Sequence, residues 1–254
     1  MTIQKAQTLL QLHQDPSLLV LVNVWDVISA RVVADLPGCT ALATASHSIA
    51  ATLGYDDGEN IPREEMLSLV GRIAAAVDLP VTADLEAGYG DPGETVRQAI
   101  ALGVVGANIE DRMKPLPEAV AAVEAVVKAG ESEGIPFVLN ARTDAFVKAG
   151  DRARSDVLAE AIVRGKAFVE AGAAVVFVPG KLSADEVSAL VAGIGPVSLI
   201  AVPGSISLPE MQRLGVQRVS LGPWSQRLAL TALADAGAAI LAGGSLPDGV
   251  RPLN

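Results

Sequence analysis

Short apolar segments alternate with amphipathic segments along most of the chain. The apolar segments are rich in β-branched and aliphatic residues and are bounded by Gly, Pro or polar residues, which is typical of buried strands. They occupy residues 19–24, 40–44, 80–84, 104–109, 136–141, 174–179, 197–202 and 217–221. Between most of them, apolar residues recur at helical spacing, as in REEMLSLVGRIAAAV from Arg63. Eight strands alternating with helices predict parallel β/α units, and a closed (β/α)₈ TIM barrel fits this number better than an open sheet.

Three similar stretches indicate repeated units: AIALGVVGANIE, FVEAGAAVVFVP and MQRLGVQRVSLG. Each has a glycine, namely Gly103, Gly172 or Gly215, where a helix C-cap would precede a strand. The 254 residues match the roughly 250 that such a barrel needs, and no linker divides them. We therefore predict one barrel domain over residues 1–254. Extra helices at about 3–13 and 224–243 are expected to cap the barrel or to pack on another subunit.

Composition narrows the class of protein further. Half of the residues are hydrophobic but only 3% are aromatic, as expected for buried parallel strands under alanine-rich helices. The net charge of −10, without a cluster of Lys and Arg, argues against nucleic-acid partners. Cys39 is the only cysteine, so no internal disulfide can form and a cytoplasmic location is expected. No apolar run reaches the roughly 18 residues of a membrane helix, so no membrane partner is predicted.

Polar side chains occur in pairs at the ends of five consecutive strands. Residues i and i+2 of a strand point the same way, and barrel active sites form at the carboxyl ends of the strands. The pairs are Asn23 and Trp25, Thr44 and Ser46, Asp84 and Glu86, Asn108 and Glu110, and Asn140 and Arg142. We expect one polar mouth, with Trp25, Ser46, Asn140 and Arg142 as substrate-binding residues.

The charges at this mouth suggest a cation. Three carboxylates, Asp84, Glu86 and Glu110, face one guanidinium, that of Arg142, and buried charges are costly unless paired or bound to metal. Oxygen ligands without a His or Cys cluster suit Mg²⁺ or Mn²⁺. The alternative is structural: Glu110 and Arg142 form an ion pair while Asp84 and Glu86 cap nearby helices.

The stretch TADLEAGYGDPG at residues 82–93 also matches G-x-G-x-x-G, the fingerprint of dinucleotide-binding loops. Against that interpretation, Asp84 and Glu86 would face the pyrophosphate without a cation, and the motif follows the third strand. A turn is the simpler explanation: Asp91 caps a helix that begins at Pro92, and Gly88 and Gly90 relax the backbone.

Read in order, DLEAGYG, NIEDR and NARTDAF at the ends of strands three to five resemble the isocitrate lyase and phosphoenolpyruvate mutase superfamily. The resemblance runs from about Asn23 to Gly222. It implies a (β/α)₈ barrel that is usually tetrameric, with the last helix swapped between subunits. We therefore expect a homo-oligomer, a dimer or tetramer, in which the alanine-rich helix after Trp224 is exchanged.

The same resemblance implies roles for particular residues. Asp84 matches the direct Mg²⁺ ligand, and Arg142 matches the arginine that stabilises the anionic substrate or intermediate. Ser46 lies near the stretch whose amides receive the substrate carboxylate or phosphonate. The acids that hold the waters of the ion or face its shell are Glu86, Glu110 and Asp57 of TLGYDDGE. Members chelate an oxo acid on Mg²⁺, which holds the enolate that bond cleavage produces.

One family feature is missing. Isocitrate and methylisocitrate lyases carry a catalytic Cys in a K-K-C-G-H loop after strand four, whereas NIEDRMKPLPEAV passes almost directly into the next helix. Cys39 lies too far away to replace it, and the loop Asn of phosphonate-acting members is also unmatched. The candidate proton donors are His47, Tyr55 and Tyr89. Of these we take His47 as catalytic, together with Arg142, Asp57 and Glu110. Arg112 and Lys114, beside the missing loop, are expected at the solvated surface.

These features predict a Mg²⁺-dependent lyase or decarboxylase. It would cleave a C–C bond next to a 2-oxo unit, or in a hydroxylated di- or tricarboxylate, through a metal-stabilised enolate, and its partner is a small anionic carboxylate. One alternative is a mutase or hydrolase of a phosphonate P–C bond. Others are a barrel that binds a carboxylate without turnover and a dinucleotide-dependent oxidoreductase.

Overall fold

The computed structural model describes residues 2–253, and Met1 and Asn254 lie outside the described residues. The strands are β1 (Leu19–Leu21), β2 (Asn23–Val24), β3 (Leu42–Thr44), β4 (Val81–Asp84), β5 (Gly106–Glu110), β6 (Val138–Arg142), β7 (Val175–Phe177), β8 (Val197–Ile200) and β9 (Arg218–Ser220). The helices are α1 (Thr2–Gln14), α2 (Val27–Ala34), α3 (Ser46–Leu53), α4 (Arg63–Ala75), α5 (Pro92–Ala101), α6 (Leu116–Ser132), α7 (Arg154–Glu170), α8 (Ala184–Ile194), α9 (Leu208–Arg213) and α10 (Trp224–Leu241).

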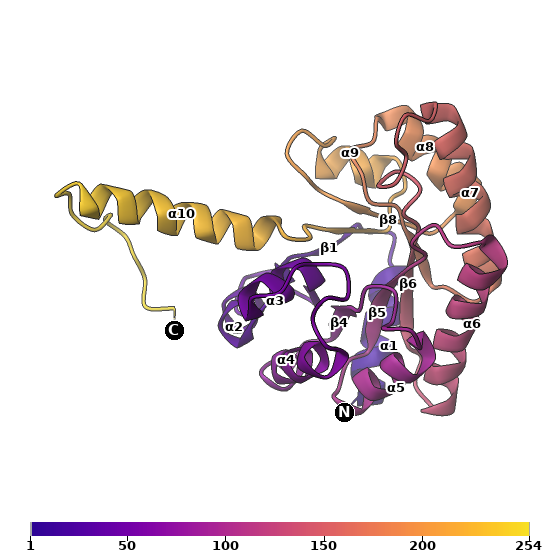
Figure 1. Cartoon of the computed structure of the whole chain (residues 1–254), viewed down its shortest axis with the longest axis horizontal. Helices are drawn as coiled ribbons and strands as arrows, with labels where there is room; N and C mark the ends of the chain where they lie inside the picture. Colours follow the sequence, from indigo (N-terminus) through magenta and orange to yellow (C-terminus); the bar gives the residue numbers. More distant parts are fainter. Residues whose placement is uncertain (1, 254) are drawn as a thin grey trace.

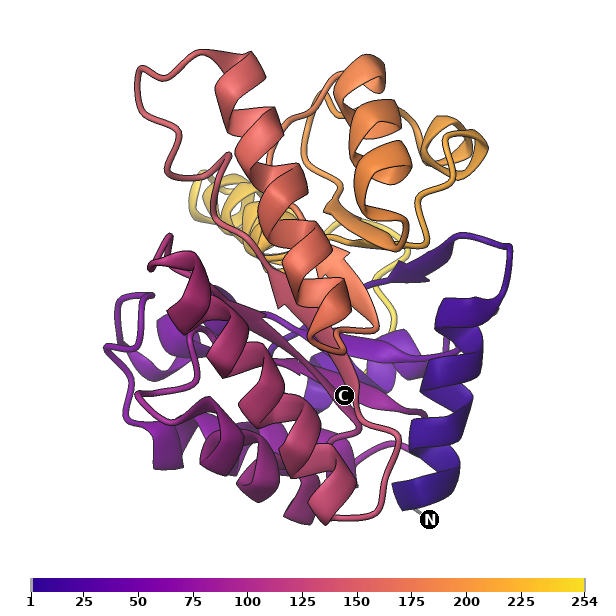
Figure 2. The ribbon, with the colours of Figure 1, turned by 90° about the vertical axis from the view of Figure 1, so that its right-hand side faces the viewer.

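All strands belong to one parallel sheet with the order β1-β9-β8-β7-β6-β5-β4-β3-β2. β1 and β2 are consecutive parts of one segment, separated by Val22, so their pairing with β9 and β3 closes the sheet into a barrel. The helices pack around the outside of the strands (Figures 1 and 2). The (β/α)₈ prediction is confirmed, with the first strand divided in two.

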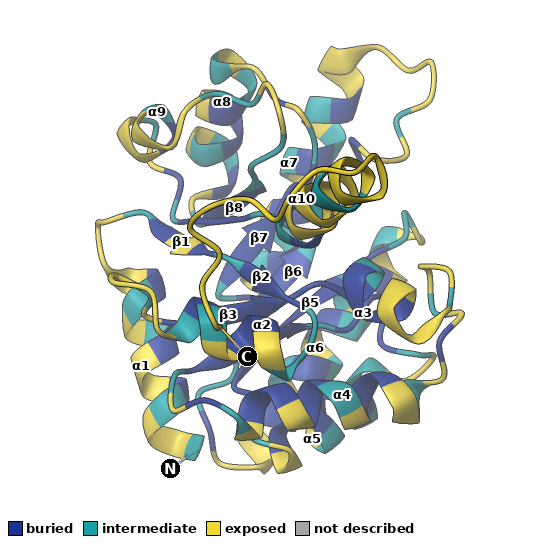
Figure 3. Cartoon of the chain, turned by 90° about the vertical axis from the view of Figure 1, so that its left-hand side faces the viewer, coloured by how far each residue is buried: buried dark blue, intermediate teal, exposed yellow. Residues whose placement is uncertain are grey.

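The strands are buried along most of their length, and several become partly exposed at their carboxyl ends. In both β5 and β6 every residue is buried except the last, Glu110 or Arg142. In Figure 3 the strands accordingly form the buried centre of the molecule. The predicted glycines do end their helices, but each lies one residue after the C-cap, which is Leu102, Ala171 or Leu214. Gly103, Gly172 and Gly215 all have positive φ angles, which glycine adopts without steric cost.

Helix α1 packs at the amino ends of the strands, opposite the polar mouth. Its Leu9 is fully buried against Gly106, where a Cβ atom would lie only 2.8 Å from Leu9 Cδ2. His13 of the same helix is also buried, and its Nδ1 lies 2.8 Å from the carbonyl oxygen of Leu9. Burial and the positive charge of Arg218 lower the pKa of His13 to about 4, so this end of the barrel holds a neutral imidazole at pH 7.

Helix α10 extends away from the barrel (Figure 1) and is almost entirely exposed (Figure 3). Its side chains Leu228 and Leu233 are each 69% exposed, and Leu241 is 91% exposed. An apolar groove lies where the helix leaves the barrel, between α2 and the start of α10, and includes Trp25 and Leu228 in its lining. Within residues 2–253, the helices are all too short or too polar to cross a bilayer.

Candidate active site

A cavity of about 170 Å³ opens at the carboxyl ends of the strands. Its lining includes residues in or next to eight strands, β2 to β9, and Asp57 of the loop after α3: Asn23, Ser46, His47, Asp57, Asp84, Asn108, Arg142, Phe177, Ile200 and Ser220. The polar residues predicted from five strand ends therefore share one site in part, as expected when parallel strands end at a common rim.

Asp84, the last residue of β4, is held at the start of helix α3. Its Oδ2 accepts hydrogen bonds from the backbone N–H of Ser46 at 3.2 Å and from Ser46 Oγ at 2.9 Å. Ser46 Oγ also lies 3.3 Å from Asp57 Oδ1, so one hydroxyl connects the two acids. Oδ1 of Asp84 has no hydrogen bond to the described part of the chain. The carboxylate is thus oriented by α3 and keeps one oxygen for a ligand.

Arg112 lies among three glutamates above the strand ends. Its guanidinium pairs with Glu59 at 3.1 Å, with Glu86 at 3.4 Å and with Glu110 at 3.0 Å. The expected surface position is correct for Lys114, which is exposed, but wrong for Arg112, whose side chain is 28% exposed. The sequence concealed this because Glu59 lies in a loop far away in the chain, and only folding brings it opposite the end of β5.

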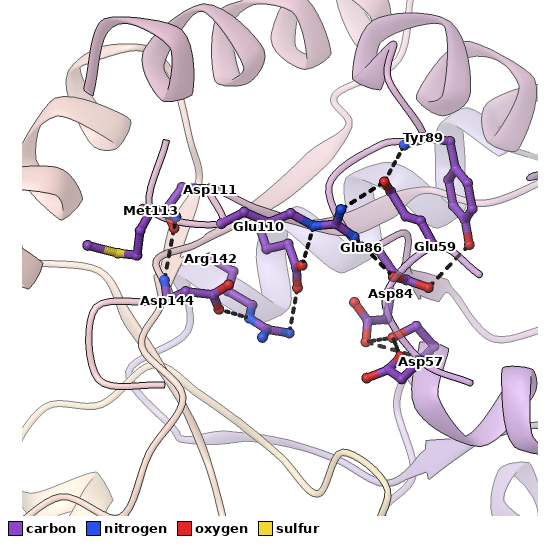
Figure 4. Close-up of polar contacts among 12 residues, drawn as sticks. Asp57, Glu59, Asp84, Glu86, Tyr89, Glu110, Asp111, Met113, Arg142 and Asp144 are labelled. Atoms are coloured by element: carbon purple, nitrogen blue, oxygen red, sulfur yellow. Dashed lines mark hydrogen bonds and ion pairs between the residues drawn. The ribbon is translucent and has the colours of Figure 1, made fainter. Parts of the chain in front are cut away.

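Arg142 lies between two carboxylates, as Figure 4 shows. Its Nη1 contacts Glu110 Oε2 at 2.9 Å, and its Nε donates to Asp144 Oδ1 at 2.8 Å. Asp144 is almost fully buried and was not among the predicted site residues, although its spacing of two from Arg142 repeats the pattern of the other pairs. Both acids hold the guanidinium plane towards the cavity that Arg142 lines.

The side chain of Asp111 stabilises the turn after β5. Its Oδ1 accepts the backbone N–H groups of Met113 at 2.9 Å and Asp144 at 3.0 Å, and its Oδ2 pairs with buried Arg164 of α7 at 3.2 Å. This buried bond network orders the short segment that stands in place of the long catalytic loop.

The acids at the mouth raise one another's proton affinity. Burial, followed by the negative charges of Asp57, Asp84 and Glu110, raises the pKa of Glu86 to about 7. Burial also raises the pKa of Glu110. The contact of Glu86 with Arg112 at 3.4 Å does not cancel this excess of negative charge. A divalent cation would relieve it.

The donor set fits Mg²⁺ or Mn²⁺ better than a softer metal. Among residues 2–253 no three carboxylate, imidazole or thiolate groups converge into a closed ligand set. One carboxylate with a free oxygen, surrounded by further acids, matches an ion that keeps several waters and takes few protein ligands. Asp84 would hold the ion directly, and Asp57, Glu86 and Glu110 would accept hydrogen bonds from its waters.

The two structural alternatives from the sequence are partly present beside this site. Glu110 and Arg142 do form an ion pair, and Asp84 accepts the first N–H of α3. The Glu86 side chain contacts Arg112 and Tyr89, and it caps none of the helices that the structure describes. These contacts leave the free oxygen of Asp84 unused, so they are compatible with a metal site.

Two predicted substrate-binding residues lie outside the cavity lining. Trp25 is half-buried and lines the apolar groove beside α10. Asn140 is fully buried beneath the cavity and donates to Asn108 Oδ1 at 2.7 Å. Asn108, which belongs to the same set of strand-end pairs, does line the cavity. Asn140 and Asn108 are paired in the register of β5 and β6, but only Asn108 lines the cavity.

The glycine-rich stretch after β4 forms the turn that the sequence predicts. Asp91 is the N-cap of α5, with Oδ1 accepting from Glu94 N at 3.0 Å, and Pro92 begins the helix. Gly88 has a φ of 88°, and a Cβ atom there would lie 2.5 Å from Pro92 Cα. Glycine is therefore required for a tight turn.

Several non-glycine residues around this mouth have left-handed backbone conformations. Within the described residues they are Glu59, Glu86, Tyr89, Arg112 and Met113. Such conformations are costly for residues with side chains and persist where surrounding contacts impose them. Their gathering at the acid cluster supports a functional site.

The chain is thus a (β/α)₈ barrel with acids and an arginine at the carboxyl ends of its strands. Residues 9–241 match the family model described as phosphoenolpyruvate phosphomutase, and the chain belongs to this family. The resemblance to the isocitrate lyase and phosphoenolpyruvate mutase superfamily is thereby confirmed.

Named relatives and solved structures agree with this assignment. An oxaloacetate decarboxylase of Rhodopseudomonas palustris (strain HaA2) is 31% identical over 208 residues, covering 78% of this chain and 71% of the relative. A solved structure from Burkholderia cenocepacia J2315, provisionally called a phosphonomutase, is 38% identical, with a TM-score of 0.88 over 96% of this chain and 100% of that one. The structure of an oxaloacetate acetylhydrolase in complex with the product oxalate is 27% identical, with a TM-score of 0.87 over 99% and 92% of the two chains. The likenesses to the decarboxylase and the acetylhydrolase support a carbon–carbon lyase of this superfamily.

Proposed function

We propose that this protein is a Mg²⁺-dependent lyase that decarboxylates, or otherwise cleaves next to the keto group, a small 2-oxo dicarboxylate of the oxaloacetate type. The main observation in support is that Asp84, with a free carboxylate oxygen, and the guanidinium of Arg142 line the same small cavity. Its volume of about 170 Å³ is below the roughly 300–1,000 Å³ of sites for drug-sized ligands, which favours a small acid.

Each rim residue has a role that its contacts support. Mg²⁺, when bound, supplies a Lewis acid that favours negative charge on a keto oxygen. Arg142 binds the substrate's negative charge and is oriented for this by Glu110 and Asp144. Ser46 uses both its N–H and its hydroxyl on Asp84, so it positions the metal ligand.

The carbanion left by bond cleavage needs a proton, and His47 is the best-placed side chain. It lines the cavity, and its Nδ1 is buried without a partner among the described residues. Tyr55 is engaged elsewhere, with its hydroxyl donating to Glu65 at 2.9 Å. Burial and the carboxylates of Glu86 and Glu59 raise the pKa of Tyr89, which makes it a poor acid.

The proposed reaction is tested by a Mg²⁺-dependent assay of pyruvate or CO₂ release on oxaloacetate, alkylmalates, methylisocitrate and phosphonopyruvate. We expect turnover of a 2-oxo or hydroxylated dicarboxylate that stops when a chelator is added and returns with excess Mg²⁺. Buffer with Mg²⁺ alone is the control, because free divalent cations promote decarboxylation of β-oxo acids. Turnover of phosphonopyruvate and of no other compound in the panel would favour a mutase or hydrolase of a P–C bond. Tight oxalate binding without any turnover would favour a carboxylate-binding barrel.

We also propose that the protein is a homo-oligomer in which α10 of one subunit packs on another. The helix exposes Leu228, Leu230 and Leu233, and the adjacent groove is lined mainly by apolar side chains, some of which belong to α2 and α10. Exposed apolar surfaces of this kind mark interfaces in soluble proteins. The organisation of the chain as one domain and its cytoplasmic location also remain predictions.

The double substitution Leu230→Glu/Leu233→Glu is expected to shift the protein to a smaller species, because each buried leucine contributes roughly 1.5–3 kcal/mol to association. Light scattering after size-exclusion chromatography measures the mass. The matched control is Val147→Glu/Val163→Glu, which alters side chains that are 54% and 55% exposed on other parts of the surface. An unchanged mass for the α10 variant, or a monomeric wild type, would refute the exchange.

A further inference from the structure

A charged side chain crosses the inside of the barrel beneath the cavity. Arg218 begins β9 and is fully buried, and its Nη2 lies 3.3 Å from Oδ1 of Asn108 on β5. When β1 and β2 are counted as one segment, β5 and β9 are four strands apart in either direction around the barrel. The Arg218 side chain therefore extends across the barrel interior from β9 to the opposite strand, β5.

Arg218 is a costly residue at this position. Barrel interiors are normally filled by Val, Ile and Leu. Here Nε and Nη1 of Arg218 are buried without a hydrogen-bond partner among the described residues, and no carboxylate forms an ion pair with it there. A buried charge without a paired partner is costly, and an apolar side chain of similar volume would not carry that cost. Stability therefore does not explain this arginine.

The hydrogen bond that the Arg218 guanidinium makes within residues 2–253 determines the orientation of an amide. Asn108 and Asn140 form a buried pair in which Asn140 Nδ2 donates to Asn108 Oδ1 at 2.7 Å. The opposite orientation of both amides would make an equally good pair, because each amide has a donor and an acceptor. A guanidinium can only donate, so Arg218 requires the oxygen of Asn108 on its side.

This orientation decides which hydrogen-bonding atoms of Asn108 remain available to a ligand. Oδ1 of Asn108 accepts from both Asn140 and Arg218, whereas Nδ2 makes no hydrogen bond to the described residues. Asn108 lines the cavity together with Asp84 and Arg142. The free amide N–H groups are thus the part of Asn108 available to a ligand, and they can only donate.

We propose that Asn108 binds the substrate by donating a hydrogen bond from Nδ2 to one of its oxygens, and that Arg218 is the positioning residue that fixes this orientation. The inference rests on the proposed function, since it takes the ligand to be a small oxo acid or its analogue. It adds one substrate-binding residue and one positioning residue that lies outside the cavity.

The test measures oxalate binding by calorimetry in the presence of Mg²⁺ and thermal unfolding of the same variants. For Arg218→Met we expect about tenfold weaker oxalate binding, as for the loss of one hydrogen bond to a charged group, with an unchanged or higher unfolding temperature. Arg218→Lys keeps a donor and the charge, and should bind nearly as well as the wild type. The proposal would be contradicted if Arg218→Lys bound oxalate more weakly and unfolded at a lower temperature while Arg218→Met did neither.

A double-mutant cycle tests whether Arg218 affects oxalate binding by orienting Asn108 or through its own charge. Asn108→Leu should also weaken oxalate binding about tenfold, and Asn108→Leu/Arg218→Met should bind no more weakly than Asn108→Leu alone. Losses that multiply in the double variant would overturn the proposal, because Arg218 would then act without Asn108. If Asn108→Leu does not fold, Asn108→Asp keeps the acceptor for Arg218 and replaces only the donor, and wild-type affinity in that variant would overturn the proposal equally.

Failure of this inference and of the proposed function can be distinguished. A wild-type protein that binds no oxalate with Mg²⁺ counts against both. Normal oxalate binding by the wild type together with unchanged binding by Arg218→Met refutes only the role of Arg218 and leaves the proposed function intact.

Discussion

Replacing Asp84 by Asn is expected to lower kcat/KM by more than about a hundredfold and to remove most of the Mg²⁺ affinity. Loss of an outer partner of a metal ligand costs roughly 10–100-fold, and loss of the direct ligand should exceed that. The substitution keeps the side-chain size but removes the charge at the atom where the cation would bind. The measurements are initial rates on the best substrate of the panel and calorimetric titration with Mg²⁺.

Asp91→Asn is the matched control for this variant. Asp91 caps α5 through Oδ1 and does not line the cavity. Asn caps helices about as well as Asp, so both stability and activity should stay close to wild type. Full activity of Asp84→Asn would refute the metal site, and equal losses in both variants would indicate a general loss of structure.

Replacing Arg142 by Lys is expected to lower kcat/KM by roughly 10²–10³, the usual effect of removing one oriented donor from a site of charge development. Lysine keeps the charge but has no planar fork, so it cannot contact Glu110 and Asp144 and still present a donor to the substrate. The steady-state value of kcat/KM and the affinity for oxalate should fall together, because the guanidinium faces the anion before and during the reaction.

The control for Arg142 is Arg213→Lys. Arg213 also pairs with a carboxylate through two nitrogens, at 2.9 and 2.6 Å from Glu210, but it lies on the surface of α9. Exposed pairs contribute little to stability, so this variant should behave like the wild type. An Arg142→Lys variant with wild-type kinetics would exclude Arg142 from substrate binding.

Arg112 and Glu59 illustrate what local patterns miss. Arg112 follows β5 in a short polar segment that looks like a surface turn, and Glu59 lies in the loop before α4. Their ion pair depends on how that loop crosses the end of β5, and no spacing rule relates residues so far apart in the chain. Asp144 could have been found, because its distance of two residues from Arg142 follows the same pattern as Asp84 and Glu86.

The strand positions, the glycines at helix ends and the start of α5 at Asp91 and Pro92 follow from the sequence by itself. Each depends on interactions within one segment: the burial of a short apolar run, the left-handed conformation that glycine permits, or a side chain that caps the next N–H groups. The common rim of the polar strand ends follows as well, because parallel strands in a closed barrel all end on one side.

Only the tertiary structure decided which of these polar side chains reach the cavity. Asn108 and Asn140 share a strand-end pattern and are paired in the sheet, yet Asn108 lines the cavity whereas Asn140 is fully buried. Arg218 ends in the barrel interior because its strand faces β5 across the barrel. Such contacts depend on the packing of segments more than a hundred residues apart, and that packing has no signature in any single segment.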